Sequence, residues 1–95
     1  MPVYFNASIR IKDQEGYSKY LEKAGDIFRK YNGRYLAVDD DPVVLEGRWE
    51  YTRAVPIEFD TRENFEKWYH SADYREILRH RLASAECDTI LLEGK

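Results

Sequence analysis

Two glutamates, Glu46 and Glu58, have the spacing that acid–base chemistry requires. If residues 51–53 form a hairpin loop, the resulting register places Glu46 directly opposite Glu58 on one face of a sheet. Two carboxylates held side by side raise the pKa of one of them, which yields a proton-transfer group near neutral pH. The pattern therefore predicts a carboxylate pair able to act in catalysis.

The same glutamates also fit a structural role, in which Arg10, Arg34 or Arg48 neutralises them in an ion pair. Solvent access separates the two interpretations. A catalytic Glu58 should line a cavity open to solvent, whereas a structural Glu58 should be closed off by an arginine at hydrogen-bond distance.

His70 is the third candidate for proton transfer, although an exposed position at a helix end explains it equally well. It does not form a nucleophilic dyad with Ser71, because adjacent helical residues do not face each other. The run 39–41, three aspartates before Pro42, is typical of a solvated turn, since a calcium loop spaces its ligands more widely. We expect no metal and no cofactor, and haem is disfavoured because no histidine falls on a clearly buried face.

The elements that must position these residues follow from periodicity. Residues 3–11 alternate between apolar and polar, as do residues 54–59, and both segments are predicted strands. Asp13 is a candidate N-cap for an amphipathic helix that ends at Asn32 and Gly33. Residues 34–49 are predicted to form strand, turn and strand, or one long interrupted strand, with Val43–Leu45 extended after the break and Gly47 marking a bulge. Residues 87–92 form the last strand.

An aromatic stretch, residues 65–74, organises the second helical region. Phe65, Trp68 and Tyr69 fall on one helical face, and Ser71 is a candidate N-cap for a second run through Tyr74. We therefore predict a helix in two parts, with its aromatic side packed on the sheet, and some tyrosine hydroxyls at the rim of a cleft between helix and sheet. Arg75, Arg79 and Arg81 are interpreted as a solvated helix face.

The predicted order β-α-β-β-α-β defines an α+β, ferredoxin-like domain over residues 1–95, with a four-stranded antiparallel sheet and two helices on one face. The uncovered face would carry polar residues together with Val44, Ile90 and Leu92. This mixture predicts a homodimer formed through the sheet faces, and a monomer with a wet sheet face is the alternative.

Composition narrows the function classes. The formal net charge of −3 argues against a nucleic-acid partner, and no apolar run approaches the length of a membrane helix. The first residues lack the features of a signal peptide, and the single cysteine, Cys87, excludes an intrachain disulfide. A cytoplasmic location is the expectation.

Four motifs carry a resemblance to a known family. They are Asn32-Gly33-Arg34-Tyr35, Leu45-Glu46-Gly47-x-Trp49, Ile57-Glu58-Phe59 and Trp68-Tyr69-x-Ser71-x-x-Tyr74. In order and spacing they resemble the uncharacterised family called domain of unknown function 1330, whose usual Gly-Gly-Arg-Tyr turn here begins with Asn32. The resemblance implies a dimeric α/β-barrel, a fold shared by cofactor-free monooxygenases, muconolactone-type isomerases and haem enzymes.

These lines of reasoning predict a polar pocket on the sheet face away from the helices, built around Glu58. Its proton-transfer candidates are Glu46, Glu58 and His70. Its candidate ligand-binding residues are Asn6, Ser8, Arg34, Tyr35, Trp49, Ser71 and Tyr74. The expected function is a cofactor-free enzyme that transfers protons on a small organic acid or aromatic. The alternative is a non-catalytic dimer that binds a metabolite or a protein partner.

Overall fold

The computed structural model describes all residues, 1–95. Its elements run in the predicted order, and the second helical region is divided into two helices, as predicted. They are β1 (Val3–Ile11), α1 (Gln14–Lys30), β2 (Gly33–Tyr35), β3 (Arg53–Phe59), α2 (Arg62–Tyr69), α3 (Ala72–Ser84) and β4 (Ala85–Glu93). None of the helices has the length and apolar character needed to cross a membrane.

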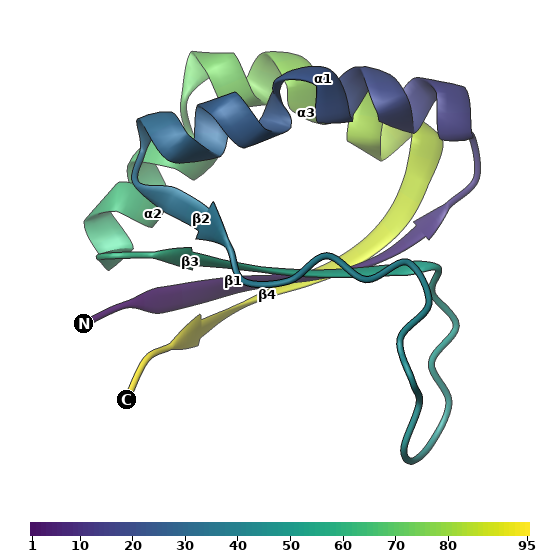
Figure 1. Ribbon diagram of the computed structural model, residues 1–95. Coiled ribbons are helices and arrows are strands. Elements are labelled where there is room, and N and C mark those ends of the chain that lie inside the picture. The colour runs from purple at the N-terminus through teal and green to yellow at the C-terminus, as the bar shows by residue number, and fades with distance from the viewer.

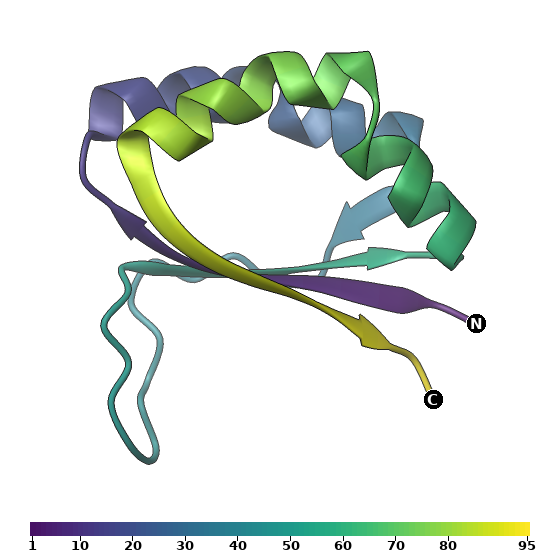
Figure 2. The same ribbon diagram turned by 180° about the vertical axis from the view of Figure 1, so that it is seen from behind.

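The strands form one antiparallel sheet in the order β2-β3-β1-β4. The helices lie together on one side of this sheet, and the other side is uncovered (Figures 1 and 2). We call the uncovered side the open face. Side chains along β1 alternate between the two faces of the sheet as predicted, so that Val3, Phe5 and Ile9 are buried against the helices. On β4, Ile90 and Leu92 lie on the open face.

Short polar side chains begin the helices. The Asp13 carboxylate accepts a hydrogen bond from the Gly16 backbone N–H at 3.2 Å, and the Ser71 hydroxyl accepts one from the Tyr74 N–H at 3.1 Å. The helix after β3 is capped by Thr61, whose hydroxyl accepts from the Asn64 N–H at 3.0 Å. The break at Ser71 therefore separates α2 from α3, as the sequence predicts.

The turn after α1 depends on two adjacent residues. Asn32 adopts a left-handed conformation with φ of 63°, which an asparagine tolerates better than most residues. Gly33 is required for space, because a Cβ there would lie 2.6 Å from the Phe59 ring. This turn brings β2 onto the edge of β3 and fixes the position of Arg34 and Tyr35.

The core is an aromatic cluster around Trp68, whose side chain is fully buried. The Trp68 ring lies 5.1 Å from the rings of Phe5 and Phe59, 4.9 Å from Phe28 and 4.1 Å from Tyr74. These rings come from β1, β3, α1 and α3, so one side chain on α2 contacts every layer of the fold. The predicted aromatic core is confirmed.

The segment between β2 and β3 differs from the prediction. Residues 40–52 form no strand and extend away from the sheet on its open side (Figures 1 and 2), and we call this segment the arm. A bridge between Asp39 and Ala54 closes its base, and Gly47 within it has φ of 81°. The predicted strand at Val43–Leu45 is wrong, because no neighbouring strand lies beside it to accept its backbone hydrogen bonds.

Trp68→Ala should lower the free energy of unfolding by roughly 3–5 kcal/mol, because the cavity would open among rings from four elements. Denaturant unfolding at a fixed protein concentration measures this loss. Leu82→Ala on the exposed side of α3, where Leu82 is 64% accessible, is the matched control and should cost under about 0.5 kcal/mol. Equal losses for the two variants would show that Trp68 does not organise the core.

Candidate functional site

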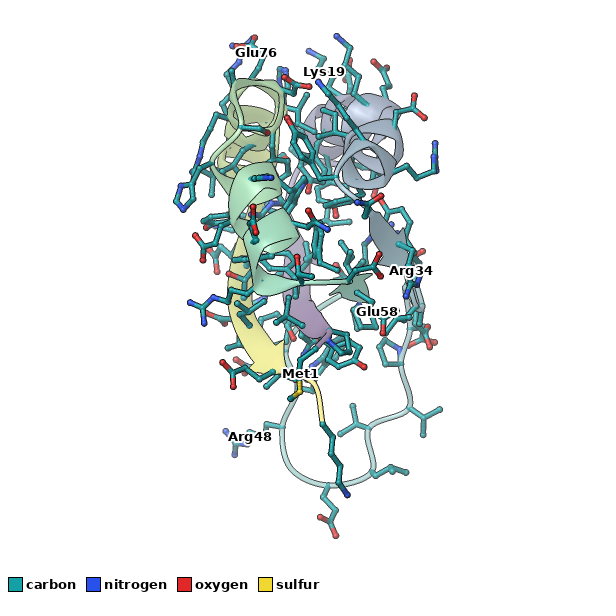
Figure 3. The ribbon with its side chains drawn as sticks, turned by 90° about the vertical axis from the view of Figure 1, so that its left-hand side faces the viewer. Met1, Lys19, Arg34, Arg48, Glu58 and Glu76 are labelled. Atoms are coloured by element: carbon teal, nitrogen blue, oxygen red, sulfur yellow. The ribbon has the colours of Figure 1, made fainter.

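Glu58 forms an ion pair with Arg34 at the open face. The two residues lie opposite each other in the β2–β3 register, and Figure 3 shows them side by side. Only 15% of the Glu58 side chain is accessible, whereas 57% of the Arg34 side chain is. On the other side of Glu58 the register places Tyr4. Arg34 also contacts Asp60, with a nitrogen–oxygen distance of 3.2 Å. Of the alternatives considered for this glutamate, the ion pair with Arg34 is the one present.

Glu46 has no partner in the strand register and does not lie opposite Glu58. It belongs to the arm, so the predicted hairpin that would place it opposite Glu58 is wrong. Trp49 is also on the arm, where its ring lies 5.2 Å from that of Tyr51. The two catalytic glutamates of the prediction are therefore not brought together within one chain.

Asn6 and Ser8 point to the open face as predicted, but they are not neighbours of Glu58. The register places Asn6 opposite Pro56 and Ser8 opposite Ala54. None of the cavities in the single chain is lined by Glu58, Asn6 or Ser8. A catalytic role for Glu58 stays a prediction.

His70 and Ser71 lie at the junction of α2 and α3. The His70 ring is exposed and lies 3.2 Å from a Glu66 carboxylate oxygen and 3.5 Å from an Arg75 guanidinium nitrogen. Ser71 is the N-cap of α3. Both positions are explained by helix ends and surface charges, and neither residue faces the other candidates.

Tyr35 and Tyr74 point toward the helix side, into the interior of the domain. The Tyr35 ring packs edge-on against Phe28 at 5.3 Å, and the buried Tyr74 hydroxyl lies 3.0 Å from the Tyr20 hydroxyl. Tyr35 lines an internal cavity between α1 and the sheet, and Tyr74 contacts Tyr20, which lines the same cavity. The sequence predicted only a cleft rimmed by tyrosine hydroxyls in this region.

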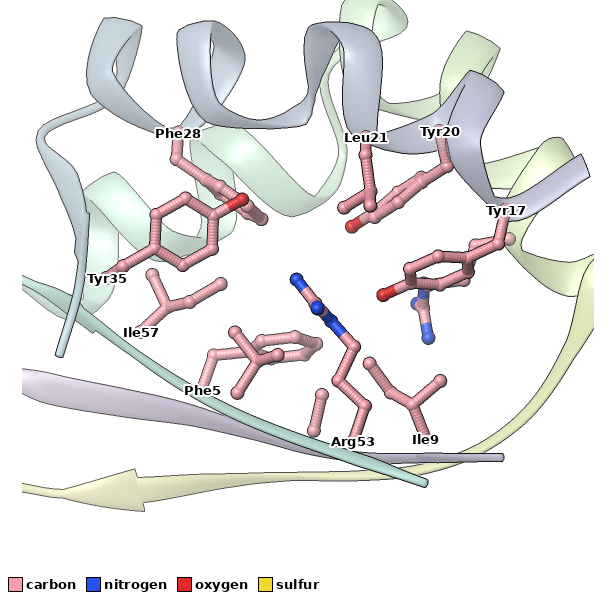
Figure 4. Close-up of a pocket in the computed structure, with 12 residues that line it drawn as sticks. Phe5, Ile9, Tyr17, Tyr20, Leu21, Phe28, Tyr35, Arg53 and Ile57 are labelled. Atoms are coloured by element: carbon pink, nitrogen blue, oxygen red, sulfur yellow. The ribbon is translucent and has the colours of Figure 1, made fainter. Parts of the chain in front are cut away.

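The cavity lies beneath α1 and above β1 and β3 (Figure 4). Ten of its twelve lining residues are hydrophobic, and the two remaining ones are arginines, Arg53 and Arg81. Its free volume is about 20 Å³, enough for one water molecule. Figure 4 shows the hydroxyls of Tyr17, Tyr20 and Tyr35 directed toward the space around the Arg53 guanidinium. The cavity thus combines apolar walls with a few converging polar groups, as ligand pockets do, but at its present volume an organic ligand fits only after a side chain moves.

Arg53 rises from the start of β3 into this cavity (Figure 4). Its Nη1 lies 2.8 Å from a carboxylate oxygen of Asp40, at the base of the arm, and its guanidinium lies 5.8 Å from the centre of the Tyr17 ring. Only 12% of its side chain is accessible, and its buried Nε has no hydrogen-bond partner. Arg53 thus fills much of the cavity while keeping one donor free.

Arg81 is buried to 4% accessibility, so its assignment to a solvated face with Arg75 and Arg79 is wrong. One of its terminal nitrogens lies 3.4 Å from the Tyr74 hydroxyl, and its Nε has no partner. Burial works to lower the pKa of Arg81, but Tyr74, Tyr20 and Cys87 outweigh it and raise the pKa. The guanidinium therefore stays charged, and no carboxylate lies beside it to balance the charge.

The surrounding tyrosines do not supply that balance. Burial raises the pKa of Tyr17 to about 12, and it raises the pKa values of Tyr20, Tyr74 and Tyr35 above their ordinary range as well. Their hydroxyls are therefore neutral at physiological pH. They can donate and accept hydrogen bonds around an anion, but they carry no negative charge themselves.

A second, polar cavity of about 430 Å³ opens beside the first and shares Tyr17, Leu21 and Arg53 with it. Lys12, Gln14, Asp40 and Thr52 complete its polar lining. Tyr17, Leu21 and Arg53 therefore lie between an outer, polar mouth and an inner, apolar chamber.

The sequence carries signals for both arginines that the prediction missed. Arg53 precedes Val55, Ile57 and Phe59 in strict alternation, so period two places it on the buried face. Arg81 follows Tyr74 by seven residues, which places it on the same helical stripe. Arg81 was instead grouped with the charged Arg75 and Arg79, and Arg53 was placed in the assumed hairpin loop of residues 51–53.

The strand order, the antiparallel register and the placement of the helices on one face define a ferredoxin-like α+β domain. The family model described as Domain of unknown function (DUF1330) matches residues 2–95, so the chain belongs to that family. The predicted family and fold are confirmed. No curated protein matches the chain significantly.

Solved structures share this fold. A protein of unknown function from Rhodopseudomonas palustris superposes with a TM-score of 0.85 at 19% identity, over 99% of this chain and 82% of that one. A dimeric ferredoxin-like protein of unknown function from Jannaschia sp. CCS1 has a TM-score of 0.73 at 9% identity, over 99% and 100% of the two chains. SnoaB, a cofactor-independent oxygenase from Streptomyces nogalater, has a TM-score of 0.69 at 11% identity, over 99% and 93%.

The buried tyrosines predict an alkaline loss of stability. Between pH 10 and 12 the unfolded chain loses the Tyr17 proton while the folded chain retains it, so the free energy of unfolding falls as pH rises. The stability contributed by this group is fully present below pH 10, and roughly 2–3 kcal/mol is lost by pH 12. Denaturant unfolding across this range measures the slope.

Tyr17→Phe should flatten that slope, because the variant has no phenol to ionise. Tyr31→Phe, a change of the same kind at a partly exposed position on the C-terminal side of α1, is the matched control and should leave the slope closer to that of the wild type. An unchanged slope in Tyr17→Phe would contradict the pKa assignment.

Proposed function

We propose that this protein is a homodimeric binding protein for a small organic anion that carries a flat ring, and that the ligand occupies the cavity between α1 and the sheet. One observation carries the proposal: Arg81 is a buried guanidinium with no carboxylate beside it and a free Nε. Burying an unbalanced charge is costly, so a site that keeps one gains from an anionic ligand.

The cavity walls support a ring as the other part of the ligand. They are apolar and largely aromatic, with Phe5, Phe28 and Ile57 facing the chamber (Figure 4). A carboxylate or phenolate group would bind between the arginines, and the tyrosine hydroxyls would fix its orientation. Since the chamber has room for only one water at present, entry requires Arg53 to turn toward the outer mouth, where Asp40 already holds one of its nitrogens.

The lining supports binding better than proton transfer. No carboxylate and no imidazole lines the inner chamber, and its tyrosines keep their protons at neutral pH because burial raises their pKa values. A general base is therefore not among the groups that would contact the ring. The non-catalytic alternative, a metabolite-binding dimer, is the one that this geometry favours.

The open face supports the homodimer. Ile90 and Leu92, which are 54% and 48% accessible, are large apolar side chains on a sheet surface that also carries the polar Asn6 and Ser8. Structures with this fold from Jannaschia and Thermobifida fusca are described as dimeric. A second copy facing this surface would cover both side chains and remove water from the Arg34–Glu58 pair.

Ligand binding is tested with benzoate and 4-hydroxybenzoate, with neutral benzamide as the control of similar shape. We expect both anions to raise the melting temperature and to bind in titration calorimetry, and benzamide to do neither, because only an anion balances the arginines. Equal binding of benzamide and benzoate, or no binding of either anion, would overturn the proposal.

Arg81→Met should lower benzoate affinity at least tenfold without unfolding the protein, because replacing an unbalanced buried cation with an apolar chain of similar length often preserves stability. Arg79→Met is the matched control, since Arg79 is exposed on the same helix and pairs with Glu76. Circular dichroism checks that both variants fold. Loss of benzoate binding in both variants would argue against a specific role for Arg81.

The homodimer is tested by sedimentation velocity. We expect a species of twice the 11.3 kDa chain mass at micromolar concentration. Ile90→Asp should shift it to the monomer, because a carboxylate would be buried at the centre of the sheet-to-sheet contact. A monomeric wild-type protein at these concentrations would contradict the dimer.

A further inference from the structure

We infer that the arm, residues 40–52, is a clasp that packs on a second copy of this chain. The inference rests on the proposed homodimer but concerns a different surface, because the arm is not part of the sheet. Each subunit would extend its arm past the facing sheet of its partner, and the two-fold symmetry of the pair would make the two contacts identical.

The length of the arm supports this assignment. Figures 1 and 2 show the arm extending away from the helices, on the side where a facing sheet would lie. From Pro42 to Gly47 an extended chain reaches roughly 16 Å, whereas facing sheets pack about 10 Å apart. The far end of the arm therefore extends beyond the plane of a facing sheet. A second copy on the open face must lie alongside the arm.

The base of the arm is fastened to its own sheet. The Arg10 Nε donates to the Glu50 carbonyl at 2.7 Å, and the Tyr51 hydroxyl bonds to the Asp88 carboxylate across the open face. On the outgoing side, the Asp39–Ala54 bridge and the Arg53–Asp40 ion pair hold the chain. Both ends of the arm are thus held to the sheet, and this fixes the direction in which the arm extends.

The outer part of the arm has the opposite character. Val43, Val44 and Leu45 are consecutive apolar residues with 83%, 47% and 88% of their surfaces accessible. Leu45 and Val43 are the two most exposed of the large hydrophobic residues in the chain. Three apolar side chains exposed to water do not stabilise a solvated loop. A fixed base with an uncovered apolar end therefore indicates a surface that contacts another molecule.

A groove within the arm, bordered by Ala54 of β3, belongs to the same surface. It has a volume of about 340 Å³, and seven of its eight lining residues belong to the arm, Val43, Val44, Leu45 and Trp49 among them. Trp49 supplies a large aromatic anchor of the kind that dominates interface energetics. The apolar residues at the end of the arm and Trp49 therefore line one groove, which a partner can cover as a single surface.

The inference is tested by measuring the dimer dissociation constant of the full chain by sedimentation. We expect Leu45→Asp to raise it at least tenfold while circular dichroism stays unchanged, because residue 45 makes no contact within its own subunit that folding needs. Leu82→Asp is the matched control, since Leu82 is exposed on α3 on the helix side, and it should change the constant less than twofold.

A photo-crosslinking residue placed at position 45 gives an independent readout. Irradiation should yield a covalent dimer, and the same residue at position 82 should yield none. If Ile90→Asp dissociates the dimer while Leu45→Asp does not and position 45 gives no crosslink, the sheet-to-sheet dimer stands and the clasp is wrong. If the wild-type chain is a monomer, the dimer proposal and the clasp both fail.

Discussion

The packing of aromatic rings around Trp68 is the constraint on which the rest of the structure depends. The Trp68 ring contacts rings from β1, β3, α1 and α3, so the helices cannot move off the sheet without opening the core. Because all of this packing is on one face of the sheet, the domain is closed on one side and open on the other. The internal cavity lies on the closed side, and the arm projects from the open side.

Most of the fold could be predicted from the sequence because its signals are local. Alternation placed β1 and β3, and the N-cap side chains of Asp13 and Ser71 marked helix starts that the structure confirms. The segment Val43–Leu45 failed for a physical reason: a strand exists only where a neighbour accepts its backbone hydrogen bonds, and composition does not reveal the neighbour. Three apolar residues in a row look the same whether they are in a sheet or at the end of an arm.

The candidate site was harder to predict because one wrong strand register changes which side chains lie opposite each other. The assumed hairpin brought Glu46 to Glu58, and in its absence the carboxylate at that position is held by Arg34 instead. For the arginines the difficulty was different. Arg53 was placed in the assumed hairpin loop, and Arg81 was interpreted with its charged neighbours as a solvated face, which is where charged side chains usually lie. A buried charge of this kind is informative because packing alone does not explain it.

Asp40 connects the two sides of the molecule. It is the first residue of the arm, which extends to the open side, and its carboxylate holds the Arg53 guanidinium, which reaches into the cavity on the closed side. Arg53 lines both the apolar cavity and the polar one. The proposed dimer contact and the proposed ligand site are therefore adjacent parts of one structure, joined by the Arg53–Asp40 pair.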